Sequence, residues 1–102
     1  MPDLTTVTCV TVVAESLIQQ ELARAIEKCG ARGWTVTMAQ GTGPGAHGVS
    51  GIEGGNIRFE ALVSADTAAR IWAVLESDFF PYYAVTAWSY DVQVSRAARF
   101  AD

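Results

Sequence analysis

Basic residues and long apolar runs are both scarce in this chain of 102 residues. Seven lysines and arginines face 11 aspartates and glutamates, and no basic run occurs, which argues against a nucleic-acid or anionic-membrane surface. No stretch approaches the roughly 20 apolar residues that span a bilayer. The N-terminus also lacks the charged flank and apolar core of a signal peptide. We therefore expect a cytoplasmic protein that binds no nucleic acid.

Cysteine and histidine are too few for a disulfide framework or a metal cluster. Cys9 and Cys29 stand at unrelated positions, and we expect two reduced thiols in or near the core. His47 is the single histidine, with only Glu53 as a nearby polar partner. A catalytic histidine needs a nucleophile or an orienting carboxylate, and a metal needs more ligands. The sequence thus predicts no catalytic residue and no metal site.

Half of the residues are hydrophobic, which is enough to build a core. The length fits one domain over residues 1–102. Alternating or valine-rich patterns predict strands over 5–13, 34–40, 56–63 and 83–94. Strands 34–40 and 56–63 flank one connection without a helix, so we expect them to form an antiparallel hairpin. With the two helices described next, the order is βαββαβ, an α+β, ferredoxin-like fold.

The first predicted helix follows Ser16, which with Gln19 has the spacing of a capping box, and it ends at Gly30. The second covers 64–80, with Asp66 as the expected cap and Pro81 as the stop. Its expected buried stripe is Ala68, Ile71, Trp72, Leu75 and Phe79.

Two helices cover only one face of such a sheet. The other face would carry the apolar side chains of the last strand, namely Trp88, Tyr90 and Val92. An uncovered apolar face implies a partner, most simply another copy of the chain.

The connection over residues 41–55 holds seven of the nine glycines and no lysine or arginine. Connections this long are uncommon in small domains and are usually functional or disordered. Successive glycines allow backbone N–H groups to converge on an anion. The segment matches neither a dinucleotide fingerprint, since no helix is expected to follow, nor a Walker A motif. The alternative interpretation is that this connection is a disordered loop that binds no ligand.

Polar side chains flank this connection on both strands. Thr35 and Thr37 lie on the polar face of the strand that enters it, and Arg58 and Glu60 on that of the strand that leaves it. Together they could hydrogen-bond a sugar, a base edge or a small anion. The alternative is a cross-strand surface lattice worth a few tenths of a kcal/mol per pair. The aromatic stretch "FFPYYAVTAW" also has two interpretations. Its tyrosines could line a ligand cleft, or the stretch could simply form a helix end, a turn and a buried strand.

The stretches "GARGWTV" (30–36), "NIRFEALV" (56–63) and "FFPYYAVTAW" (79–88), with the long connection between the first two, resemble PII-like signalling proteins. The chain looks closest to the branch linked to inorganic-carbon uptake: the carboxysome-associated proteins and the regulator of a bicarbonate transporter. The similarity covers residues 7–96. It implies a homotrimer with three adenine-nucleotide sites in clefts between neighbours, a mobile T-loop over 41–55, and a C-terminal tail over 95–102.

The resemblance also implies the ligand and its contacts. Carried onto this chain, the nucleotide-binding residues are Gly33, Thr35, Thr37, Gly41, Gly43, Gly45, Arg58, Glu60, Tyr82 and Tyr83. Arg58, Gly41 and Gly43 would also meet bicarbonate. The glycine- and lysine-rich phosphate signature of classical PII is replaced by "FFPYY". We therefore expect AMP, ADP or cyclic AMP to be preferred over ATP.

The function implied is that of a non-enzymatic sensor. Its protein partner would be a bicarbonate transporter, which would bring the chain to the membrane periphery, or a carbon-fixation component. Two other classes remain open from the residues: a small cofactor-free oxygenase or isomerase of the ferredoxin-like αβ-barrel kind, and a purely structural oligomer. The enzyme would need a polar group in a pocket of the sheet, whereas the polar groups noted above lie beside the glycine-rich connection.

Overall fold

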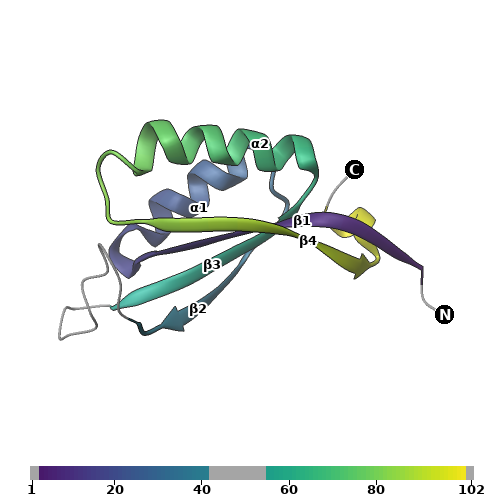
Figure 1. The fold of residues 1–102 in the computed structure, drawn as a ribbon, viewed down its shortest axis with the longest axis horizontal. Helices are drawn as coiled ribbons and strands as arrows, with labels where there is room; N and C mark the ends of the chain where they lie inside the picture. Colours follow the sequence, from purple (N-terminus) through teal and green to yellow (C-terminus); the bar gives the residue numbers. More distant parts are fainter. Residues whose placement is uncertain (1–2, 42–54, 101–102) are drawn as a thin grey trace.

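The computed structural model describes residues 3–41 and 55–100, and it confirms the βαββαβ order. The strands are β1 (Leu4–Glu15), β2 (Thr35–Ala39), β3 (Asn56–Val63) and β4 (Thr86–Ser95), and the helices are α1 (Gln19–Lys28) and α2 (Ala65–Val74). The strands form one antiparallel sheet in the order β2-β3-β1-β4. Figure 1 shows both helices on the same face of this sheet. The predicted hairpin is therefore confirmed as the β2–β3 pair.

Strand β1 lies at the centre of the sheet, between β3 and β4. Its valine-rich sequence suits this place because its side chains are buried on both faces of the sheet. Val10 and Val12 are buried beneath the helices, while Cys9 and Thr11 are buried on the opposite face. The valine-rich pattern predicted a strand here, but it did not predict that a threonine would be buried in it.

The first helix begins later than its sequence suggested. Ser16 opens a short 3₁₀ turn, Ser16–Ile18, and no side-chain capping bond forms, so the capping box is wrong. The prediction for the other end is confirmed: Gly30 has a φ of 115°. A Cβ there would lie 3.3 Å from the Thr67 hydroxyl, so glycine is favoured by backbone conformation and by space.

The second helix is capped by Ser64, and the expectation for Asp66 is wrong. The Ser64 hydroxyl accepts a hydrogen bond from the Thr67 N–H at 3.2 Å. Asp66 lies in the first turn instead, where a carboxylate interacts favourably with the helix dipole. Beyond α2 the chain continues as a π-helical turn, Leu75–Phe79. Of the expected buried stripe, only Trp72 is partly exposed.

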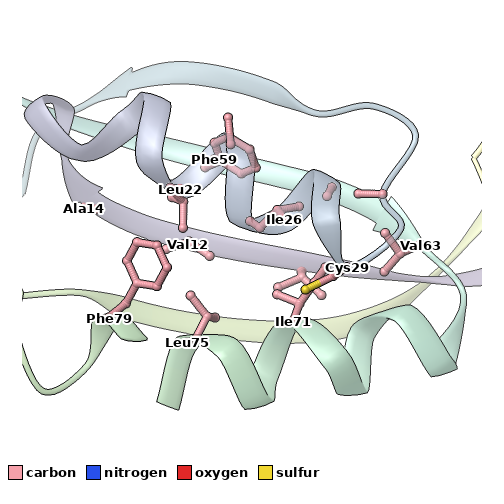
Figure 2. Close-up of a cluster of buried hydrophobic side chains, with 14 of the residues drawn as sticks. Val12, Ala14, Leu22, Ile26, Cys29, Phe59, Val63, Ile71, Leu75 and Phe79 are labelled. Carbon is pink, nitrogen blue, oxygen red and sulfur yellow. The ribbon is translucent and has the colours of Figure 1, made fainter. Parts of the chain in front are cut away.

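The hydrophobic core fills the space between the helices and the sheet. Figure 2 shows Leu22 and Ile26 of α1 and Ile71 of α2 pointing towards β1 and β3. Phe59 is fully buried and stacks on Trp34, with ring centroids 5.0 Å apart. Because side chains alternate along a strand, burying Phe59 directs its neighbours in sequence to the other face.

The sheet edges depart from the sequence patterns. Met38 alternates with the threonines of β2, yet it is 71% exposed because β2 is an edge strand that pairs only with β3. Strand β4 begins at Thr86 rather than at residue 83. Tyr82 and Tyr83 therefore belong to the connection after the π-helical turn.

Candidate functional site

The sheet face without helices carries a polar cluster centred on Glu60. This residue pairs with Thr35 on β2 and with Thr11 on β1. Its Oε2 accepts a hydrogen bond from the Thr11 hydroxyl at 3.4 Å and a weak one from the Cys9 thiol at 3.7 Å. Arg58 donates to the same oxygen at 3.5 Å. The Glu60 carboxylate thus links β1 and β3 on the open face.

Arg58 lies between Glu60 and an aromatic ring. Its guanidinium carbon lies 5.6 Å from the centroid of the Trp88 ring, a cation–π distance. The ion pair with Glu60 is partly exposed, with 42% and 29% of the two side chains accessible, so it adds little to stability. The cation is held in place yet still reachable from solvent, as anion binding requires.

Tyr90 completes the cluster from β4, where it pairs with Cys9. A side-chain hydrogen bond with Cys9 and the electrostatic interaction with the same side chain, then burial and the charge of Glu60, raise the pKa of Tyr90, whereas the charge of Arg58 lowers it. The phenol therefore stays protonated at neutral pH and can donate a hydrogen bond.

A pocket of about 450 Å³ opens over this cluster. Three of the predicted binding residues, Gly33, Thr35 and Glu60, line it. The pairs Thr35–Glu60 and Thr37–Arg58 form as expected, but Thr37 and Arg58 lie beside the pocket rather than in its lining. The other lining side chains, which the sequence interpretation did not include in the site, are Cys9, Trp34, Leu62, Tyr90, Val92 and Phe100.

The C-terminal tail brings Phe100 to the pocket. Arg32 donates from Nη1 to the carbonyl oxygen of Ala98 at 2.6 Å, which ties the tail to the segment before β2. Arg96 and Arg99 line an adjoining pocket of about 470 Å³ that shares Leu62 and Phe100 with the first.

Of the four glycines predicted to bind the ligand, Gly33 and Gly41 belong to the described residues. Gly33 and Gly41 have no positive φ, and a Cβ at either position would meet nothing within 4 Å. The fold therefore does not require glycine there. Gly43 and Gly45 lie outside the described residues, as does His47, so the proposed amide contacts of 41–55 stay a prediction.

Tyr82 and Tyr83 line a different, smaller pocket of about 190 Å³ with Glu15, Ile18 and Ala84. It shares no residue with the pocket over Glu60. Tyr83 donates a hydrogen bond from its hydroxyl to Glu21 Oε2 at 3.0 Å, while Tyr82 is 72% exposed. In a single chain, the described residues of the predicted site thus lie in at least two separate places.

The Tyr83–Glu21 contact makes a testable prediction about pH. The hydrogen bond to Glu21, then the charge of Glu21 and burial, raise the pKa of Tyr83. Because this pKa is higher in the folded than in the unfolded state, the contact stabilises the fold below pH about 10 and is lost as pH rises through the folded value. Glu21→Gln should lower the pKa, as followed by the NMR shifts of the Tyr83 ring.

The matched control for this titration is Glu76→Gln. Glu76 is an exposed carboxylate of the π-helical turn. Its replacement by glutamine should leave the NMR titration curve of Tyr83 unchanged. An unaltered curve in Glu21→Gln would show that the contact does not form in solution.

The described part of the chain holds no group of three histidine, cysteine or carboxylate residues able to bind a metal. Both cysteines are free and buried, which confirms the expectation of core thiols. None of the described helices is long and apolar enough to cross a membrane.

Two helices on one face of a four-stranded antiparallel sheet define a ferredoxin-like fold, and a pocket lies on its other face. The family model for nitrogen regulatory protein P-II matches residues 7–99. The chain therefore belongs to the P-II family, whose members are signalling regulators rather than enzymes. No curated protein sequence matches it.

Solved structures agree with this assignment. A PII-like signalling protein of Thermus thermophilus is 40% identical, with a TM-score of 0.83 over 96% of this chain and 98% of that one. CPII of Thiomonas intermedia K12, solved with ADP, AMP and bicarbonate, is 18% identical, with a TM-score of 0.84 over 100% of both chains. GlnK of B. subtilis, solved with ATP, is 13% identical, with a TM-score of 0.62 over 85% of this chain and 84% of that one. The family resemblance seen in the sequence is confirmed.

Proposed function

We propose that this protein is a non-enzymatic sensor that binds AMP, ADP or cyclic AMP, with bicarbonate as a second ligand, and regulates a partner in inorganic-carbon uptake or fixation. The observation that carries the proposal is the pocket over Glu60 in a P-II chain, where Gly33 and Thr35 come together beside Arg58. CPII, with the same fold, holds ADP, AMP and bicarbonate.

The charges around the pocket suggest how a nucleotide would lie. Glu60 would repel phosphate, so this carboxylate and the Thr35 hydroxyl suit ribose hydroxyls or the base amine. The phosphate would lie towards Arg58 and Thr37, at the end of the hairpin that leads to Gly41. Among the described residues of this hairpin, Arg58 is the one cation, and it already pairs with Glu60. This supports the preference for short phosphates over ATP.

A homotrimer would bring the separated residues together. Trp88 and Tyr90 are 38% and 43% exposed on the open face of a single chain, which favours coverage by another copy. In the trimer that we propose, Tyr82 and Tyr83 of one copy would face the Glu60 pocket of its neighbour. Sedimentation of the purified protein tests this step, and a monomer would contradict it.

Calorimetric titration with AMP, ADP, cyclic AMP and ATP, each with and without bicarbonate, tests the function. We expect the first three to bind more tightly than ATP. Much tighter ATP binding would overturn the ligand preference. The absence of binding by any adenine nucleotide at millimolar concentration would overturn the sensor and favour a structural oligomer.

A substitution at Gly33 tests whether the pocket is the site. Gly33→Ala should leave the melting temperature nearly unchanged because its Cβ meets nothing within 4 Å. The added methyl group would, however, occupy space that the ligand needs. We expect ADP to bind several-fold more weakly, at a cost of about 1 kcal/mol.

The control for Gly33→Ala is Gly55→Ala, which alters a residue with a φ of 59° outside the lining of the Glu60 pocket. This control should lower the melting temperature because of backbone strain. Wild-type ADP affinity in Gly33→Ala would show that the nucleotide binds elsewhere.

A further inference from the structure

A groove runs between the two helices, and none of the predicted ligand residues lines it. Its volume is about 650 Å³, and α1, α2 and the π-helical turn line it. It shares no lining residue with the pocket over Glu60 or with the pocket beside Tyr82. Figure 1 shows these helices above the face of the sheet opposite to the candidate nucleotide site.

Positive charge gathers in this groove although the chain as a whole is acidic. Arg24, Lys28 and Arg70 line it, which are three of the seven basic residues of the chain and include its single lysine. A chain with a net charge of −4 has few cations to place. With the three basic side chains set against two acidic ones in the lining, the groove keeps a small positive excess, which favours a negatively charged occupant.

Neither Arg24 nor Lys28 is paired with a carboxylate in the described part of the chain. No side-chain ion pair or hydrogen bond within the described part of the chain involves Arg24 or Lys28. The two residues are four apart on α1, a spacing at which like charges destabilise a helix. An anion bound between them would relieve this repulsion.

Arg70 is held in place at the same groove. Its Nε donates to the carbonyl oxygen of Cys29 at 2.9 Å, and its Nη2 donates to the Thr67 hydroxyl at 3.0 Å. A guanidinium has five N–H donors, so several remain for a ligand. Because the side chain is already ordered, an occupant would lose less conformational entropy on binding it.

The rest of the lining indicates the shape of the occupant. Ala25, Ala73 and Val74 provide a small apolar floor. Glu21 and Asp78 also line the groove, and Glu21 precedes Lys28 by seven residues, roughly 10 Å along the helix axis. The groove is open rather than enclosed, which suits a peptide segment laid along two helices better than a small molecule.

We propose that this groove docks an acidic amphipathic helix of a partner protein. Carboxylates of that helix would pair with Arg24, Lys28 and Arg70, and its apolar side chains would cover Ala25, Ala73 and Val74. A basic residue of the helix would meet Glu21 and Asp78. The surface is separate from the pocket over Glu60, so partner docking through it does not require the nucleotide site that we propose.

Peptide selection on the intact protein tests the proposal. The probe is a displayed library of random peptides about 16 residues long, enough for roughly four helical turns. We expect the enriched peptides to carry aspartate or glutamate three or four residues apart beside apolar residues. Arg24→Ala with Lys28→Ala should weaken their binding at least about tenfold, because exposed charge pairs at an interface are lost. Alanine at both positions keeps the helix.

The matched control is Arg96→Ala with Arg99→Ala, which removes the same charge from the C-terminal segment and should leave peptide affinity unchanged. ADP binding should survive in the Arg24/Lys28 variant. Enriched peptides without acidic excess, or equal affinity for the Arg24/Lys28 variant, would overturn the proposal. Dissociation of the oligomer by that variant would also overturn it, because the groove would then join copies of this chain.

Discussion

Arg58→Glu is expected to weaken ADP binding at least about 100-fold, which corresponds to about 2.7 kcal/mol. The change removes the cation that pairs with Glu60 and places a second carboxylate beside it on the same face of β3. A phosphate would then meet two negative charges where it now meets one ion pair. Losing one partner of a buried, hydrogen-bonded charge pair commonly costs about 2–5 kcal/mol, and a bound phosphate would bury Arg58 in such a pair. Isothermal titration calorimetry measures the effect directly.

The fold should tolerate this change. The Arg58 side chain is 42% exposed, and both the surface ion pair and the cation–π contact with Trp88 are worth about 1 kcal/mol or less. The matched control is Arg24→Ala, which removes a cation from the helix face and should keep wild-type ADP affinity. An unchanged ADP affinity in Arg58→Glu, with the fold intact by circular dichroism, would place the phosphate elsewhere.

The order of elements was predictable because it depends on local patterns. Ile57, Phe59 and Ala61 alternate with polar residues, and the structure buries all three. The helix starts were less predictable because several residues nearby can cap. Ser64 and Asp66 are both good N-caps by type, and the choice falls to Ser64 because it follows the last residue of β3 in an extended conformation.

The candidate site was predictable only where it is local in sequence. Thr35 faces Glu60 because both belong to one hairpin, whose alternation the sequence reveals. Cys9 and Tyr90 lie on β1 and β4, and their register with β3 depends on pairings between distant segments. The available signal was Thr11, a polar residue in a valine-rich central strand, which is buried and bonded to Glu60.

The polar cluster around Glu60 shows that the sheet carries buried polar groups, which the sequence interpretation did not expect. The sheet itself was expected to carry no enclosed polar group, which counted against an enzyme. Thr11 is fully buried on the open face of the sheet and hydrogen-bonded to Glu60, so polar groups reach the middle of β1 and β3. Membership of the P-II family, rather than the placement of polar groups, therefore supports a regulator.

Phe59→Ala should destabilise the protein by about 3–5 kcal/mol, the usual cost of truncating a buried phenylalanine. Phe59 is fully buried, stacks on Trp34 and pairs with Val12 on the central strand. Small domains are stable by only about 5–15 kcal/mol, so much of the stability would be lost. Urea unfolding followed by tryptophan fluorescence measures the change.

Met38→Ala on the neighbouring edge strand is the control for this unfolding experiment. Met38 is 71% exposed, so its truncation should change the free energy of unfolding by about 0.5 kcal/mol or less. The comparison matters for function because Phe59 stands between Arg58 and Glu60 in sequence. Burial of its ring directs both charged side chains to the open face. Phe59→Ala should therefore also weaken ADP binding by the protein that remains folded. A Phe59→Ala protein as stable as Met38→Ala would contradict this account of how the core positions the site.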